Sequence, residues 1–319
     1  NGDVSLFNYI KNDLILSSDN YRHIEPRLSL RYKLNTTSSI KAAFTENYQY
    51  VHLASTSSVS LPTDLWVPSS SVIKPKFARQ YAIGYFKNLN DNMYETSLEA
   101  YYKEMTNLIE YREGYLPEDN TNSSGDDSFT FGDGESYGVE VLLKKNKGKT
   151  TGWIGYTLSK TTRYFDEVNN GIAFPAKYDR RHDLSVTATH KLSKSWVLSG
   201  VFVYASGNSI TLPTERYVIG GDIYTQFTSR NGFRVDPYHR MDIGATYTPS
   251  KKKKKFKSSW NFSIYNVYSR KNPYFIYFAL EGLDENGENQ NIQNGNVEPK
   301  AYQVSIFPIL PSITWNFNF

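Results

Sequence analysis

The chain has 319 residues, and its aromatic content of 15% is dominated by 26 tyrosines and 18 phenylalanines. Its mean hydropathy is -0.56, and because no run of about eighteen apolar residues occurs anywhere, a bundle of membrane-spanning helices is excluded. The formal net charge of +4 gives no indication of nucleic-acid binding, and the absence of cysteine is compatible with an oxidising compartment.

The predicted elements are segments in which every second side chain is apolar. In the first, residues 27–34, Leu28 and Leu30 share one face while Arg27 and Arg31 share the other. Segments with the same alternation follow at residues 39–51, 77–88, 93–111, 135–145, 150–163, 181–192, 195–206, 239–249, 258–268 and 301–319. Within the eighth, residues 197–205 are apolar on both faces, which leaves that orientation open. The sequence therefore predicts about eleven β-strands, most of them with one apolar and one polar face.

The connections between these strands alternate strictly between short and long. The short ones lie at residues 35–38, 88–92, 144–149, 193–194 and 249–257. The long ones lie at residues 53–76, 112–134, 164–180, 206–238 and 269–300. Outer-membrane barrels combine tight periplasmic turns with long extracellular loops, whereas a soluble sandwich has no reason to keep its long loops at one end. The pattern predicts an all-β fold, a transmembrane antiparallel β-barrel.

The final segment is unusually aromatic. The residues Ile313-Thr314-Trp315-Asn316-Phe317-Asn318-Phe319 alternate bulky apolar with small polar side chains. In a soluble protein such an uncovered strand would invite aggregation, while in a closed barrel its apolar face meets lipid. We interpret Trp315, Phe317 and Phe319 as a carboxyl-terminal signal for barrel assembly.

The strand count indicates part of a larger barrel. Single-chain bacterial barrels have even numbers of strands, and an open sheet of about eleven strands in lipid would leave two edges unpaired at several kcal/mol per group. We expect residues 1–25 to be the remnant of an extracellular loop and residues 26–319 to be the carboxyl-terminal half of an outer-membrane barrel. The complete barrel would have about 22 strands and a plug.

Several short motifs, in this order, carry a family resemblance. They are Glu25-Pro26-Arg27, Asp64-Leu65-Trp66-Val67-Pro68-Ser69, Gly152-Trp153-Ile154-Gly155-Tyr156-Thr157-Leu158-Ser159-Lys160, Asp179-Arg180-Arg181-His182-Asp183-Leu184, Asn266-Val267-Tyr268-Ser269-Arg270-Lys271-Asn272-Pro273 and the ending at Phe319. Each motif is loose alone, but together they span nearly the whole chain from Pro26. The chain resembles the carboxyl-terminal half-barrel of a TonB-dependent outer-membrane transporter.

The resemblance implies an active transporter of the Gram-negative outer membrane that captures a scarce nutrient at the cell surface and imports it into the periplasm. It implies long extracellular loops, and short turns and a carboxyl terminus in the periplasm. The implied partners are the amino-terminal half-barrel and plug of the same parent, the TonB complex, outer-membrane lipid, the barrel-assembly machinery and, as a further candidate, a surface lipoprotein. The ligand stays open among siderophore, haem, corrinoid, oligosaccharide and peptide.

Aromatic and basic side chains in the long connections are the candidate ligand-binding residues. Rigid aromatics suit ring stacking, and arginine suits anionic groups. The competing interpretation is that these side chains pack the loops together or form the interfacial aromatic girdle. The candidates are Trp66, Tyr115, Tyr164, Arg216, Tyr217, Tyr224, Arg230 and Arg234.

No enzyme, cofactor or metal site is predicted. The charged run from Asp179 to Asp183 is interpreted as a solvated strand entry in which arginine pairs with aspartate, since Ser185 and His182 fall on opposite faces, which argues against a triad. Three rival functions remain: a passive porin or multi-chain barrel, an outer-membrane hydrolase using Ser185 or His182, and a soluble β-sandwich adhesin.

Overall fold

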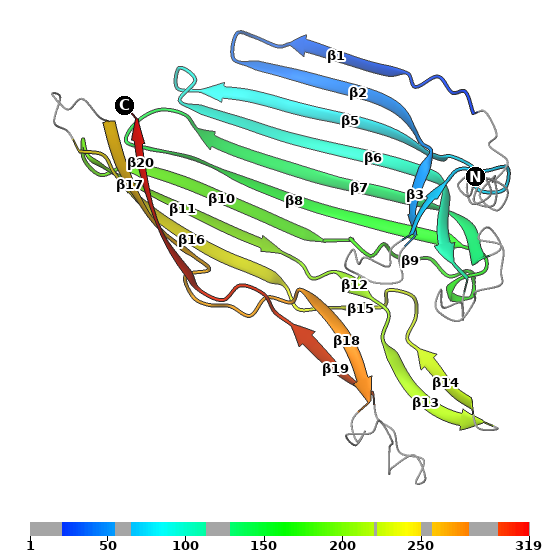
Figure 1. The fold of residues 1–319 in the computed structure, drawn as a ribbon. Coiled ribbons are helices and arrows are strands. Elements are labelled where there is room, and N and C mark those ends of the chain that lie inside the picture. The colour runs from blue at the N-terminus through cyan, green and yellow to red at the C-terminus, as the bar shows by residue number, and fades with distance from the viewer. Residues whose placement is uncertain are drawn as a thin grey trace, which may run out of the picture.

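The computed structural model describes residues 21–54, 65–112, 128–219, 222–249, 257–280 and 299–318. Its main element is an antiparallel sheet of 12 strands, in which β9 pairs only with β8 and the others follow the path β1-β2-β5-β6-β7-β8-β10-β11-β16-β17-β20 (Figure 1). The strands are β1 (Arg27–Lys33), β2 (Ser38–Gln49), β5 (Lys76–Leu89), β6 (Tyr94–Tyr111), β7 (Phe129–Lys145), β8 (Thr150–Phe165), β9 (Phe174–Pro175), β10 (His182–Lys191), β11 (Trp196–Ala205), β16 (Tyr238–Tyr247), β17 (Lys257–Tyr265) and β20 (Leu310–Asn318). All eleven predicted strands are confirmed as members of this path, with shifted ends.

The predicted last strand, residues 301–319, is wrong in its first third. The structure divides it into β19 (Pro299–Val304), which pairs with β18 (Phe275–Leu280) in a separate hairpin, and β20, which joins the main sheet. Between them Phe307 has a φ of 58°, in the left-handed region that breaks a pleated strand. Pro308 follows and has no N–H to donate to a ladder.

The long connections contain paired strands of their own. Besides β18 and β19, the structure has β3 (Val51–Ala54) paired with β4 (Leu65–Pro68), β12 (Ser209–Ile210) with β15 (Phe233–Arg234), and β13 (Pro213–Ile219) with β14 (Asp222–Phe227). Figure 1 places these pairs at one end of the sheet and the tight turns at the other. We call the first the loop end and the second the turn end.

Cross-strand register gathers the apolar side chains on one face. Residues that stand opposite each other in neighbouring strands share a face. One such row is Leu28, Phe44, Tyr81, Tyr102 and Tyr137. A second row is Leu143, Ile154, Val186, Phe202 and Met241. Because Phe202 of β11 belongs to it, the row fixes the orientation of β11 that the sequence left open. Large members of this face stay uncovered, with Ile83 58% and Ile313 67% exposed. Such a continuous apolar surface fits hydrocarbon and not water.

The opposite face is polar. The row that includes Arg31, Lys41, Glu99, Glu140 and Thr157 crosses β1 to β8 through Gly84. Charges of both signs stand side by side, as in the pair of Lys144 with Glu95 at 3.3 Å. The alternation of apolar and polar side chains predicted from the sequence is therefore confirmed.

An aromatic band borders the apolar face near the turn end. The rings of Trp196 and Tyr247 lie 4.9 Å apart between centroids, and those of Trp260 and Trp315 lie 5.8 Å apart. All belong to one register row across four strands. Amphipathic rings of this kind occupy the boundary between hydrocarbon and headgroups.

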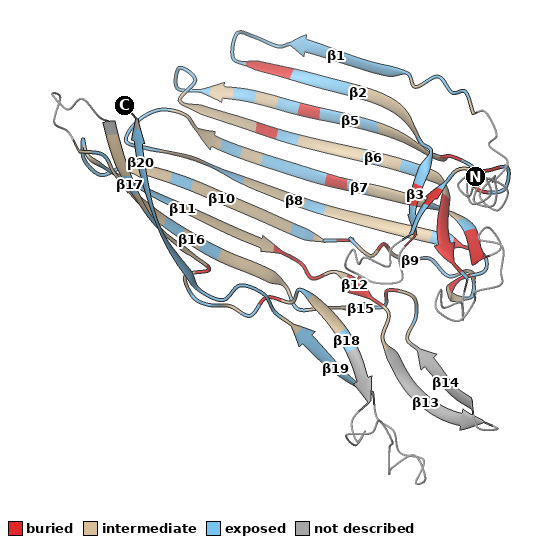
Figure 2. Cartoon of the chain, viewed as in Figure 1, coloured by how far each residue is buried: buried red, intermediate tan, exposed pale blue. Residues whose placement is uncertain are grey.

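The sheet is open. Strands β1 and β20 end the path, and in the described ranges neither has a partner on its outer side. Figure 2 shows both edge strands exposed along most of their length, while buried residues concentrate at the loop end. Across the same described ranges, no helix combines the length and the apolar character needed to span a lipid bilayer.

Gly152 allows close contact between β8 and β10. A Cβ at this position would lie 2.1 Å from the carbonyl oxygen of Thr187, whereas one at Gly155 would meet only the Trp153 ring at 3.3 Å. We expect Gly152→Ala to destabilise the folded sheet by about 1–3 kcal/mol, as overpacking does. The measurement is the urea midpoint of the full-length protein in lipid vesicles. Gly155→Ala is the control, and an equal shift for both would contradict the argument.

Candidate functional site

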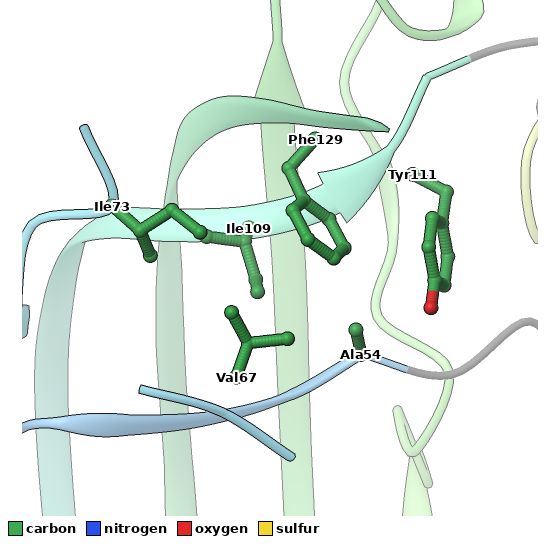
Figure 3. Close-up of a cluster of buried hydrophobic side chains, with 6 residues drawn as sticks. All are labelled: Ala54, Val67, Ile73, Ile109, Tyr111 and Phe129. Carbon is green, nitrogen blue, oxygen red and sulfur yellow. The ribbon is translucent and has the colours of Figure 1, made fainter. Parts of the chain in front are cut away.

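Two buried hydrophobic clusters hold the loop end together. In the first, the hairpin of β3 and β4 contributes Ala54 and Val67, which pack against residues at the ends of β6 and β7 (Figure 3). In the second, Leu108 and Phe165 pack with Val168 and Phe174 from the segment after β8. Elsewhere in the described part of the main sheet there is no comparable buried core. The most densely packed part of the described chain is therefore the loop end. The first cluster consists of Ala54, Val67, Ile73, Ile109, Tyr111 and Phe129.

A cavity of about 70 Å³ adjoins the first cluster. Its wall combines apolar and charged groups from three parts of the chain: the β3–β4 hairpin, the ends of β6 and β8, and the segment before β10. The lining residues are Leu53, Ala54, Ile109, Glu110, Tyr111, Arg163, Lys177 and Tyr178. We call this the loop-end cavity.

Among the described residues that line the cavity, Glu110 is the only carboxylate, and two arginines lie close to it. Its Oε1 accepts a hydrogen bond from Nη2 of Arg230 at 2.6 Å, and its Oε2 lies 3.6 Å from Nη1 of Arg163. Glu110 stands opposite Thr130 and Arg163 opposite Gly134, which places both on the polar face. A one-residue register shift between Met105 and Leu108 of β6, with Asn107 at a φ of 56°, turns Glu110 to that side.

Asp179 forms a second buried ion pair and corrects an interpretation made from the sequence. Its side chain is only 1% exposed, so the expected solvation of the strand entry is wrong at this residue, whereas Arg180 and His182 are exposed and the pairing of aspartate with arginine is confirmed. Nη2 of Arg234 donates at 2.6 Å, the Thr161 N–H donates at 2.7 Å, and Arg181 lies at 3.6 Å. Arg234 also donates to the carbonyl oxygens of Asp179 and Gly207, which fastens β15 to the segment before β10.

His52 lies almost fully buried in the β3–β4 hairpin, 3.4 Å from Oγ of Ser69 through its Nε2. Burial, aided by the charge of Lys76, lowers the pKa of His52 from its ordinary value of 6.5. Neutral His52 is therefore the form that the fold favours.

A pH dependence of the hairpin follows. Because the folded-state pKa lies below the unfolded one, the stabilisation is complete above about pH 6.5 and is lost as pH falls through the folded-state pKa. We expect residues of β3 and β4 to exchange amide hydrogens faster at pH 5.5 than at pH 7.5, after correction for intrinsic rates. His52→Asn should remove most of this dependence, and identical protection at both pH values in the natural protein would contradict it.

The predicted ligand-binding residues separate into three groups. Trp66 on β4 and Tyr164 on β8 are exposed, Trp66 by 63%, and the Tyr164 hydroxyl donates to Asp166 at 2.7 Å. Arg230 and Arg234 point into the two buried ion pairs. Contact of any of these four with a ligand stays a prediction. Arg216, Tyr217 and Tyr224 lie on the β13–β14 hairpin, whose side chains are outside the described part of the chain, as are Tyr115 and Phe319 as whole residues.

Sequence reasoning missed the residues that line the loop-end cavity. Glu110 and Arg163 sit near the ends of strands, and Lys177 and Tyr178 directly precede the charged run at Asp179. The polar-face parity of Arg163 was a usable signal. The ion pair between Glu110 and Arg230 had no such signal, because it joins residues 120 positions apart.

These features define a class of protein: a membrane-type antiparallel β-sheet with one lipid-compatible face, tight turns at one end and elaborated loops at the other. Residues 5–267 match the family model described as TonB dependent receptor-like, beta-barrel, and the chain belongs to this family. It is therefore part of an outer-membrane receptor barrel. Among curated proteins, no match to the sequence is found.

Solved structures give the same fold at low sequence identity. The ferric-catecholate import receptor Fiu from E. coli K12 is 12% identical, with a TM-score of 0.51 over 91% of this chain and 34% of that one. The ferric preacinetobactin receptor BauA from Acinetobacter baumannii is 15% identical, with a TM-score of 0.53 over 92% and 36%. The FpvAI chain of the FpvAI–pyocin S2 complex is 15% identical, with a TM-score of 0.55 over 94% of this chain and 34% of that one. The chain thus spans about a third of the length of the solved relatives that it matches.

Proposed function

We propose that the parent of this chain captures a scarce nutrient at the cell surface and imports it into the periplasm with energy delivered by TonB. One observation carries the proposal: the family match falls on a sheet whose apolar face is suited to lipid and whose loop end has a built, charged cavity. The loop end would face the medium, and the turn end and the carboxyl end of β20 would face the periplasm.

We further propose that residues 26–319 are the carboxyl-terminal half of the complete barrel, with residues 1–25 belonging to an extracellular loop. The unpaired outer sides of β1 and β20 support this division, because open sheet edges are not tolerated in hydrocarbon. The partners would be the other half-barrel and plug of the same parent, the TonB complex, the barrel-assembly machinery and a surface lipoprotein.

The test is energised uptake by the full-length protein. Cells expressing it should accumulate a ligand against its gradient, and deletion of TonB should abolish accumulation while leaving surface binding intact. Steady ion conductance by the purified protein in planar bilayers, with uptake indifferent to TonB, would favour the passive porin instead.

The ligand itself needs a screen. Solved relatives include receptors for ferric catecholates, ferripyoverdine and ferric preacinetobactin, so ferric complexes form the first panel. Haem, corrinoids, oligosaccharides and peptides form the second. At identities of 12–18%, these relatives decide only the order in which the ligands are tested.

We also propose that Trp315, Phe317 and Phe319 form the barrel-assembly signal. Trp315 and Phe317 are exposed on the apolar face of β20. Replacing Phe317 and Phe319 by serine should lower the level of folded, heat-modifiable protein in the outer membrane severalfold. Replacing Asn316 by serine on the opposite face is the control, and an unchanged level of the aromatic variant would remove the proposal.

A further inference from the structure

Positive charge is concentrated at the turn end of the sheet. Four turns, together with the strand ends beside them, contain nine lysines and only two acidic residues, Asp91 and Glu95. Their net charge of +7 exceeds the +4 of the whole chain, so the rest of the chain is net negative. Figure 1 places these turns together at one end of the sheet. The segments counted are residues 33–41, 87–95, 144–149 and 191–194.

The fifth turn continues this pattern in the sequence. Residues 251–255 and 257 are all lysines, although their side chains lie outside the described part of the chain. The turn end therefore combines a large positive charge with a single type of cationic side chain. Lysine carries its charge as a compact ammonium on a long flexible stem, which suits contact with a mobile surface of phosphates.

Most of the described lysines at the turn end lack a neutralising carboxylate. Lys144 pairs with Glu95 at 3.3 Å, and Lys147 donates to the backbone carbonyl of Asp91. Across the described ranges, the other seven have no carboxylate within ion-pairing distance. Like charges on neighbouring turns repel one another, and negative charge supplied from outside the protein relieves that repulsion.

Two of these lysines lie on the lipid-facing side of the sheet. Lys87 shares a face of β5 with Tyr81, and Lys145 shares a face of β7 with Tyr137. Tyr94 stands opposite Lys145, and the ammonium of Lys145 is 5.8 Å from the centroid of its ring. A lysine at the border of an apolar surface lays its alkyl stem along that surface and extends its ammonium to the headgroups. A tyrosine ring favours the same boundary.

The loop end of the same side has the opposite charge. Register places Glu46, Arg79, Glu104 and Glu135 in one row across β2, β5, β6 and β7, next to the tyrosines of the apolar face. Arg79 pairs with Glu46 at 2.7 Å, so the other two carboxylates of the row are in excess. The lipid-facing side is therefore polarised, and an anionic headgroup prefers its turn end.

We infer that the turn end is a binding surface for anionic glycerophospholipids, such as phosphatidylglycerol, in the leaflet that meets the periplasm. The ammonium groups of Lys87 and Lys145 contact the lipid phosphate, and Tyr94 packs against the glycerol and the upper acyl chain. The other lysines of the turns raise the local concentration of anionic lipid. The inference goes beyond transport and takes from the proposed function only the orientation of the turn end toward the periplasm.

The experiment is a lipid titration of the full-length protein, with native mass spectrometry from detergent micelles counting the bound lipids. The two probes are dioleoylphosphatidylglycerol and dioleoylphosphatidylcholine, which share their acyl chains and phosphate and differ in net charge. We expect phosphatidylglycerol to bind about tenfold more tightly or better, the effect of two lysines at an anionic group. The preference should shrink as the salt concentration rises.

Single substitutions locate the surface. Lys87→Gln and Lys145→Gln should each weaken binding of phosphatidylglycerol about fivefold and leave binding of phosphatidylcholine unchanged. Lys160→Gln is the matched control, because Lys160 stands opposite Tyr137 on the same side of the sheet but near the loop end. It should leave the affinity within about twofold. Heat-modifiability checks that each variant is folded, and the two turn-end variants test the surface independently.

Three results would overturn the inference: equal binding of the two lipids, an equal loss for Lys160→Gln and Lys145→Gln, or a preference that survives the double substitution of Lys87 and Lys145. Its failure is separable from that of the proposed function. Uptake that depends on TonB, in a protein indifferent to lipid charge, would keep the transporter and remove the lipid surface. A lipid preference that depends on Lys145, in a protein without energised uptake, would do the reverse.

Discussion

Replacing Val186 by arginine is expected to destabilise the membrane-folded protein by about 2–4 kcal/mol, the cost of a cation on the lipid face near the bilayer midplane. Val186 lies halfway along β10, opposite Ile154 and Phe202 on the apolar face. A guanidinium there must either stay in hydrocarbon or draw water and headgroups inward. The measurement is a urea titration of the full-length protein in lipid vesicles, followed by heat-modifiability on gels.

The neighbouring residue supplies the control. Ser185 lies on the polar face, opposite Gly155. Ser185→Arg should change the stability by less than about 1 kcal/mol, because its charge meets water or a plug. Equal losses for Ser185→Arg and Val186→Arg would mean that the two faces are not distinguished by their solvent.

Replacing Arg234 by alanine is expected to cost about 3–5 kcal/mol of local stability at the loop end, because it leaves the buried Asp179 carboxylate without its closest cation. The same side chain donates to two backbone carbonyls, so the attachment of β15 would weaken as well. Hydrogen exchange of residues 206–210 and 233–236 measures the loss, and limited proteolysis provides an independent readout.

Arg181 gives an internal comparison. It lies 3.6 Å from the same carboxylate and is 39% exposed, so Arg181→Ala should cost about 1 kcal/mol or less. If Arg181→Ala and Arg234→Ala opened the loop end to the same extent, the argument that the short buried contact dominates would be wrong.

The main sheet could be predicted from the sequence because a transmembrane strand imposes a local rule. Every second residue must suit lipid, and segments such as 150–163 and 239–249 obey it without reference to the rest of the chain. Strand β11 was ambiguous for the same reason, since apolar residues on both faces satisfy the rule twice. Only its register against β10 and β16 assigns Leu198 and Phe202 to the apolar face.

The loop end could not be predicted to the same extent because its contacts are long-range. The bonds of Glu110 with Arg230 and of Asp179 with Arg234 join residues 120 and 55 positions apart, and no periodicity reports such pairs. Composition correctly drew attention to the arginines of the long connections. It could not distinguish an arginine that neutralises a buried carboxylate from one that is free to meet a ligand.

The most direct test of the account is a scan of paramagnetic spin labels through residues 183–190 of β10 in the reconstituted full-length protein. Collisions with oxygen, which concentrates in hydrocarbon, should peak at Leu184, Val186 and Ala188, on the apolar face. Collisions with a water-soluble nickel complex should peak at the odd-numbered residues between them. A profile without this two-residue period, or with equal access to both reagents throughout, would contradict the assignment of one face to lipid and the other to a wet interior.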